Sequence, residues 1–203
     1  MLFPKKCVNC GKLGSYVCEK CEVGLWEEEQ LANSRLPEAL DGLMSLWAYE
    51  GIAKKIIKQA KYKFYYDCLS ELIAKSSWFI ERPEYISPDT VVVPVPLWPG
   101  RERERGFNQA KIISRSLGKI LKLETKEVLI RVRDTGRQVG RSRVERLEAM
   151  KGAFEINPKF ETLNPKQVLL VDDVWTTGAT MGECAKVLKN AGVKKVRGLV
   201  LAR

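Results

Sequence analysis

The segment from Val168 to Thr180 holds residue types that could bind a phosphorylated sugar. It joins four apolar residues to a pair of acids, Asp172 and Asp173, and then to a hydroxyl-rich turn. The carboxylates can bind sugar hydroxyls or their Mg²⁺ ion, and a turn that leads into a helix can surround a phosphate with N–H groups. The alternative is a solvated strand end and an ordinary turn whose last threonine caps the helix. The turn residues expected at the phosphate are Thr176, Thr177, Gly178, Ala179 and Thr180.

Four of the six cysteines form two CxxC pairs near the N-terminus, separated by the seven residues 11–17. Each pair can turn both sulfurs toward one metal ion, and Gly11 and Gly14 permit the tight turns that bring the pairs together. The pattern predicts a structural zinc site whose metal supplies the folding energy of a short module, on the order of 10 kcal/mol or more. A disulfide pair or a redox motif is the alternative. The expected zinc ligands are Cys7, Cys10, Cys18 and Cys21.

A run of lysines leads into aromatic residues over a further segment, residues 54–66. Lysines that bind phosphates and rings on which bases stack are the ingredients of a track for single-stranded DNA. The alternative is a lysine-coated helix whose aromatic residues lie in the core. The residues expected to bind nucleic acid are Lys54, Lys55, Lys58, Lys61, Lys63, Arg137 and Arg141.

Composition narrows the possible functions. The 203 residues include 35 lysines and arginines against 25 acids, and a formal net charge of +10 favours polyanionic partners. There is no histidine, so any chemistry must use carboxylates, hydroxyls, cysteines, backbone N–H groups or basic side chains. No apolar run approaches the roughly 18–20 residues that span a bilayer, and no signal peptide follows Met1. We therefore expect a cytoplasmic protein without membrane insertion.

Hydrophobic periodicity divides the chain into three parts that must position these residues. Residues 1–30 form the zinc module, residues 31–88 a strand and two amphipathic helices that serve as a hood and connection, and residues 89–203 alternate strands with helices. This alternation predicts an α/β fold with a mostly parallel sheet covered by helices on both faces. The expected strands lie at residues 43–49, 91–93, 127–130, 153–156, 167–171 and 196–201, and the expected helices of the last part at 107–121 and 180–190.

Two resemblances rest on these motifs. Residues 168–180 resemble the ribose-phosphate-binding motif of type I phosphoribosyltransferases. This implies the type I phosphoribosyltransferase fold, with Asp172 and Asp173 on the ribose and the turn on its 5′-phosphate. A second set of motifs spans nearly the whole chain: the CxxC pairs, Val93-Pro94-Val95-Pro96-Leu97, the run from Arg103 to Ala110, residues 133–146 and Leu201-Ala202-Arg203. Together they resemble the ComF family, which implies a cytoplasmic zinc-bearing protein that handles incoming single-stranded DNA during competence, beside a helicase-like partner.

The enzyme resemblance also gives the arginine-rich segments a role. Type I enzymes hold pyrophosphate on a loop after an early strand, which residues 94–105 match, and cover the substrate with a mobile loop, which residues 131–150 match. The implied ligand is phosphoribosyl pyrophosphate (PRPP) with Mg²⁺. Its further contacts would be Pro94, Val95, Arg103 and Arg105, and Arg133 would join the two acids as a catalytic residue. The alternative for each arginine is a solvated face or a disordered loop.

Three functions are compatible with this sequence. The favoured one is a DNA-uptake factor that binds PRPP and single-stranded DNA. The second is an active phosphoribosyltransferase of nucleotide salvage or synthesis, for which no residue indicates the acceptor. The third is a regulator that uses the pocket as a sensor.

Overall fold

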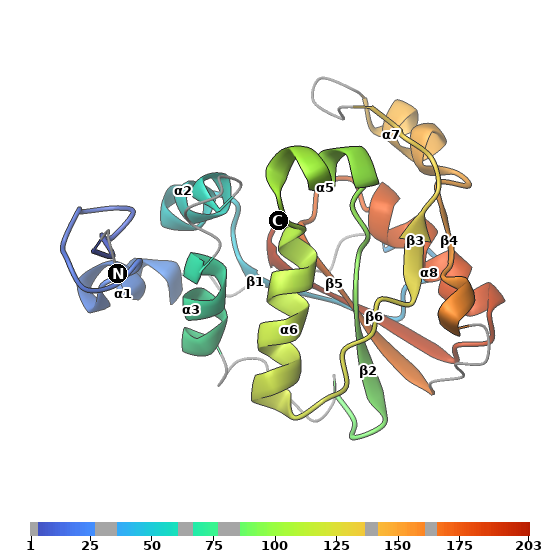
Figure 1. Ribbon diagram of the computed structural model, residues 1–203, viewed down its shortest axis with the longest axis horizontal. Coiled ribbons are helices and arrows are strands. Elements are labelled where there is room, and N and C mark those ends of the chain that lie inside the picture. The colour runs from blue at the N-terminus through green and yellow to red at the C-terminus, as the bar shows by residue number, and fades with distance from the viewer. Residues whose placement is uncertain (1–3, 27–35, 61–66, 77–85, 137–141, 161–165) are drawn as a thin grey trace.

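A four-stranded parallel sheet forms the centre of the molecule. The computed structural model describes residues 4–26, 36–60, 67–76, 86–136, 142–160 and 166–203 (Figure 1). The strand order is β1-β6-β5-β2, and each neighbouring pair is parallel. The predicted α/β fold with a parallel sheet is therefore confirmed. The strands are β1 (Leu43–Trp47), β2 (Thr90–Pro94), β5 (Gln167–Val174) and β6 (Lys195–Ala202).

The first strand of the chain belongs to this central sheet and not to a separate hood. β1 pairs with β6, with Leu43 opposite Gly198 and Trp47 opposite Ala202. The sheet thus extends one strand beyond the part expected at residues 89–203. All five residues of β1 are buried, as in β2, because a parallel sheet is covered on both faces.

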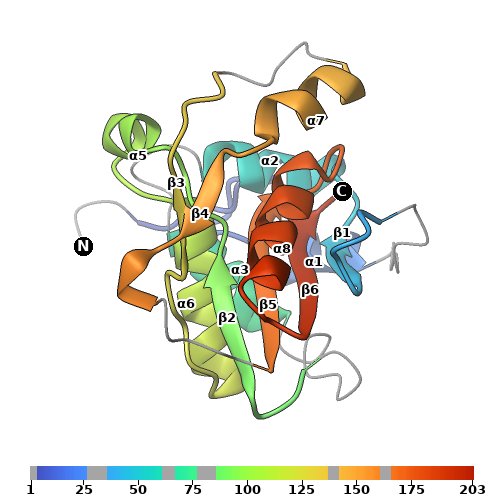
Figure 2. The same cartoon turned by 90° about the vertical axis from the view of Figure 1, so that its right-hand side faces the viewer.

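Two helical layers cover the sheet, one on each face (Figures 1 and 2). On one face, α6 (Gln109–Leu121) packs against β2, β5 and α3 (Asp67–Lys75), and α2 (Gly51–Gln59) lies beside α3. The N-terminal module with α1 (Glu19–Trp26) packs on the outside of α2. On the other face, α8 (Ala179–Asn190) packs against β5, β6 and α7 (Arg143–Met150).

Three segments differ from the sequence expectation. The expected pyrophosphate loop at residues 94–105 contains a helix, α5 (Pro99–Arg105), because Pro99 suits a first helical turn and the residues after Gly100 favour helix. The expected mobile loop at residues 131–150 contains α7, which begins at a capping box of Ser142 and Glu145. The short strands β3 (Leu129–Arg131) and β4 (Phe154–Ile156) pair antiparallel with each other, outside the main sheet.

The two cysteines outside the N-terminal module, Cys68 and Cys184, are both fully buried in the core. Within the described ranges, no helix is long and apolar enough to cross a membrane.

Candidate functional site

The two acids lie at the carboxyl end of β5. The strand continues to Val174, so Asp172 pairs with Val200 of β6 and does not follow the strand as expected. The Asp172 carboxylate accepts a hydrogen bond from the backbone N–H of Asp173 at 2.8 Å. Because successive side chains of a strand alternate between faces, the two carboxylates point to opposite sides of the sheet.

The pKa shifts of two nearby groups agree with the placement of the two acids on opposite faces of the sheet. Burial raises the pKa of the Cys184 thiol of α8, and the charge of Asp172 raises it further. Burial also raises the pKa of the Tyr49 hydroxyl on the α2 side, and the charge of Asp173 adds to that increase. The Asp172 carboxylate therefore lies on the α8 side of the sheet edge, and the Asp173 carboxylate lies on the α2 side.

The turn after β5 presents N–H groups at the start of α8. Among the described residues, the N–H groups of 176, 177, 178 and 180 have no hydrogen-bond partner, whereas that of Ala179 has a long bond of 3.4 Å to the Thr177 hydroxyl. Gly178 has φ +78°, and a Cβ there would lie 2.5 Å from the Trp175 ring. Only glycine fits this turn, and its open N–H groups suit an anion at a helix N-terminus.

A cleft of about 150 Å³ extends from the acids across the carboxyl end of β2. It contains three of the other residues expected at the ligand, namely Val95, Arg105 and Thr180. Pro94 lies in β2 and faces a neighbouring hollow instead, and Arg103 is exposed outside the cleft. The cleft is lined by Val95, Pro96, Leu97, Arg101, Arg105, Asn108, Gln109, Ala110, Arg131, Met150, Asp172, Asp173 and Thr180.

Arg131 supplies a buried cation to this cleft. Its guanidinium lies 5.4 Å from the centre of the Phe154 ring and donates a hydrogen bond to the Thr135 hydroxyl. Burial lowers the pKa of Arg131, and the positive charge of Arg101 lowers it further. In the part of the chain that the structure describes, no carboxylate forms an ion pair with Arg101, Arg105 or Arg131. Three cations that face one cleft and form no ion pair with a described carboxylate favour an anionic ligand.

Two neighbouring amides, which sequence reasoning missed, complete the cleft. Asn108 accepts a hydrogen bond from the Ala110 N–H and donates one to the Val95 carbonyl, both at 3.0 Å, so it ties α6 to the end of β2. Gln109 is only 4% exposed and accepts a hydrogen bond from Arg105 at 3.3 Å. Its amide nitrogen has no partner among the described residues and is a free donor beside the cleft.

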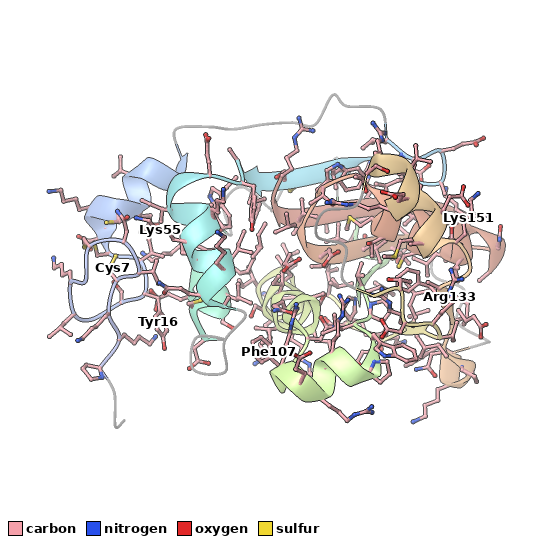
Figure 3. All side chains as sticks on the ribbon, turned by 90° about the horizontal axis from the view of Figure 1, so that it is seen from above. Cys7, Tyr16, Lys55, Phe107, Arg133 and Lys151 are labelled. Carbon is pink, nitrogen blue, oxygen red and sulfur yellow. The ribbon has the colours of Figure 1, made fainter. Side chains whose placement is uncertain are left out.

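Arg133, expected as a catalytic residue, lies outside the cleft lining. Its exposed guanidinium donates to the backbone carbonyls of Ala149 and Lys151 at the end of α7. Figure 3 shows Arg133 and Lys151 at the end of the molecule opposite to Cys7. This contact fixes α7 to the strand that carries Arg131.

The four N-terminal cysteines form a compact cluster. Their sulfur atoms all lie within 4.8 Å of one another, and those of Cys10 and Cys18 are 3.6 Å apart. Burial opposes ionisation of Cys7, but backbone N–H groups from Cys18 and Cys10 lower its pKa to about 6. The hydrogen bond from Asn9 favours the thiolate of Cys21, yet burial and the neighbouring thiols raise its pKa to about 11. Such competition for protons is relieved by a divalent cation, so the donor set fits structural zinc.

One glutamate of α3 attaches the cysteine module to the rest of the protein. The Glu71 carboxylate accepts hydrogen bonds from the backbone N–H groups of Tyr16 at 2.8 Å and Val17 at 3.2 Å, and from the Lys5 ammonium at 3.0 Å. Val17 is fully buried in the cluster that α2 and α3 share with the module. The module is thus packed against the body of the protein and is not a free arm.

The basic residues expected to bind nucleic acid separate into three groups. Lys54 and Lys58 are exposed on α2, whose opposite side buries Ala53, Ile56 and Ile57. Lys55 is also exposed, but its ammonium donates to Asn9 of the cysteine module at 2.8 Å (Figure 3). The other four lie outside the described residues: Lys61, Lys63, Arg137 and Arg141.

Comparisons with known proteins find similar sequences and structures. Residues 103–203 match the family described as "Phosphoribosyl transferase domain". The chain is 32% identical to "Competence protein ComFC" of Bacillus subtilis over 92% of this chain and 72% of the relative. It is 28% identical to "Competence protein F" of Haemophilus influenzae over 97% of this chain and 84% of the relative. A solved glutamine PRPP amidotransferase from B. subtilis is similar over 65% of this chain and 25% of that chain, with a TM-score of 0.40 and 18% identity.

Proposed function

This chain belongs to the ComF family of competence proteins, and from that membership we propose that it acts in DNA uptake as a protein that binds PRPP. The observation that carries the proposal is the pairing of two anion-binding groups at one sheet edge. The turn at residues 176–180 offers open N–H groups, and Arg101, Arg105 and Arg131 line the cleft beyond the acids. PRPP has a 5′-phosphate for the turn, a ribose for the acids and a diphosphate for the guanidiniums.

A Mg²⁺ ion would accompany the ligand. Carboxylate oxygens are ligands that Mg²⁺ accepts, and it usually keeps several waters and binds through substrate phosphates as well. Asp172 and Asp173 are the described carboxylates that line the cleft, and each is half-buried. We assign to them the ribose hydroxyls and the hydrated metal, while the guanidiniums bind diphosphate oxygens and neutralise their charge.

Calorimetric titration with PRPP and Mg²⁺ tests this proposal. Wild-type protein is expected to bind PRPP more tightly than ribose 5-phosphate, because the latter lacks the diphosphate. Arg131→Ala should weaken PRPP binding about tenfold or more, since one charge-assisted contact contributes about 1.5–3 kcal/mol. Arg103→Ala is the matched control, because Arg103 lies outside the cleft, and should change the affinity less than twofold. Absence of PRPP binding by the wild type would refute the proposal.

Binding of single-stranded DNA is the second part of the proposed function. Lys54 and Lys58 expose two ammonium groups on α2, and the chain has a formal net charge of +10. Affinity for an oligonucleotide should fall steeply with salt, and Lys58→Ala should reduce the slope of log K against log salt by about 0.7. Lys166→Ala, at the opposite end of β5, should leave the slope unchanged. A flat salt dependence of the wild type would contradict DNA binding.

Active transfer of the phosphoribosyl group is an alternative that the matched domain favours. It predicts release of pyrophosphate in the presence of an acceptor, so a screen of bases, amines and nucleotides separates turnover from binding. The helicase-like partner and the cytoplasmic location remain predictions from the family resemblance.

A further inference from the structure

An aromatic residue that the PRPP proposal does not use lies on the same side of the sheet edge as the Asp173 carboxylate. Tyr49 follows β1, and its N–H donates to the carbonyl of Arg203 at 2.7 Å. Trp47 of β1 and Val174 of β5 both pair with Ala202 of β6. The register therefore places Tyr49 at the same end of the sheet as the acids, on the α2 side, and Figures 1 and 2 both show the C-terminus beside α2.

Tyr49 presents its ring together with a positive charge. The Lys54 ammonium lies 5.7 Å from the centre of the half-buried ring, near the outer limit of a cation–π contact. Lys58 is one turn further along α2, about 6 Å along the helix axis. Among the described residues, neither Lys54 nor Lys58 forms an ion pair with a carboxylate. Both ammonium groups are thus available to a phosphate.

We propose that Tyr49, Lys54 and Lys58 form a subsite for one nucleotide of single-stranded DNA, directly beside the ribose end of the PRPP site. The base stacks on the Tyr49 ring, and the phosphates of the strand bind Lys54 and Lys58. The inference rests on the proposed function, because it gives that site its second ligand.

The electrostatics decide which part of the nucleotide faces Asp173. A phosphate close to this carboxylate would be repelled, whereas a neutral base with N–H groups would not. The raised pKa of the Tyr49 hydroxyl, caused by burial and then by Asp173, agrees with an aromatic group near the carboxylate. Lys54 and Lys58 are exposed on α2, so we assign the phosphates of the strand to them.

The choice of a strand over a free nucleotide rests on the spacing of the lysines. Two ammonium groups separated by one helical turn can each bind a phosphate of a continuous backbone. A monophosphate could use only one of them. Titrations with thymidine monophosphate and with a short oligothymidine therefore show whether the subsite binds a free nucleotide or a DNA strand.

The test measures the affinity of full-length, zinc-loaded variants for both probes and, separately, for PRPP. Tyr49→Ala should weaken oligothymidine binding about 5- to 150-fold, the range for the loss of one stacked base. Tyr49→Phe keeps the ring and should bind within twofold of the wild type. Lys54→Ala should weaken binding and lower its salt dependence, whereas Lys166→Ala is the matched control. All of these variants should bind PRPP as the wild type does.

Several outcomes would overturn the subsite. They are normal oligothymidine binding by Tyr49→Ala, an equal loss in Tyr49→Phe, or equal affinity for the monophosphate and the strand. If Tyr49→Ala fails to fold, ultraviolet cross-linking of wild-type protein to bromouridine-labelled DNA replaces it. Cross-links must then map to residues 47–58, and their absence there refutes the subsite. Failure of the PRPP site is a separate result, because it appears in the PRPP titration of the wild type.

Discussion

Replacing Asp173 with asparagine is expected to weaken PRPP binding in the presence of Mg²⁺ by about 100-fold. The carboxylate is assigned to the ribose hydroxyls and the hydrated metal, and a hydrogen bond to a charged group contributes about 1.5–3 kcal/mol. An asparagine of the same size removes the charge without opening a cavity. The fold should be unaffected, because Asp173 is half-buried at the end of β5 and outside the apolar core.

Calorimetry with PRPP and Mg²⁺ measures this loss, and Asp89→Asn is the matched control. Asp89 is an exposed carboxylate that pairs with Lys166 at the opposite end of the sheet. Its variant should bind PRPP within twofold of the wild type. If Asp173→Asn binds as tightly as Asp89→Asn, the ribose does not lie at the end of β5.

The largest loss of stability is expected from Cys18→Ser. Structural zinc contributes about 10–16 kcal/mol of apparent binding free energy to small zinc modules, so one missing thiolate should release the metal. Because Val17 and three of the four cysteines are buried against α2 and α3, the loss should spread to those helices. The expected result is a zinc content near zero, a lower Tm and a weaker helical circular dichroism signal.

A variant of another buried cysteine distinguishes the effect of metal loss from that of a packing defect. Cys68 is fully buried in α3 but lies outside the four-cysteine cluster. Cys68→Ala should keep one zinc ion per chain and lose only about 1–2 kcal/mol of stability. A Cys18→Ser protein with full zinc content and the same Tm as Cys68→Ala would exclude Cys18 as a ligand of a structural metal.

The phosphate turn could be predicted because its parts are contiguous in sequence. The acids, the turn and the start of α8 follow one strand directly, so the order of residue types is enough to place them. The opposite wall of the cleft is different. Arg101, Gln109 and Arg131 come from three separate elements, and only the folded topology brings them together.

The arginines near residue 103 show how a wrong prediction of local secondary structure led to an expected ligand contact that lies outside the cleft. The sequence interpretation placed residues 94–105 in a loop and assigned Arg103 and Arg105 to the ligand. In the helix α5, Arg101 and Arg105 are one turn apart and face the cleft, whereas Arg103 points elsewhere. Similarly, the partners of β1 lie more than 150 residues away, and no local pattern predicts such a pairing.

The attachment of the cysteine module through Glu71 also has a consequence for aggregation. The module shares one apolar cluster with α2 and α3, in which Ile56 and Leu72 are fully buried. If the module detached, the apolar surface of these helices would become a contiguous exposed hydrophobic patch. Chaperones and proteases act on such patches, so metal supply in the cell would set the abundance of the protein as well as its shape.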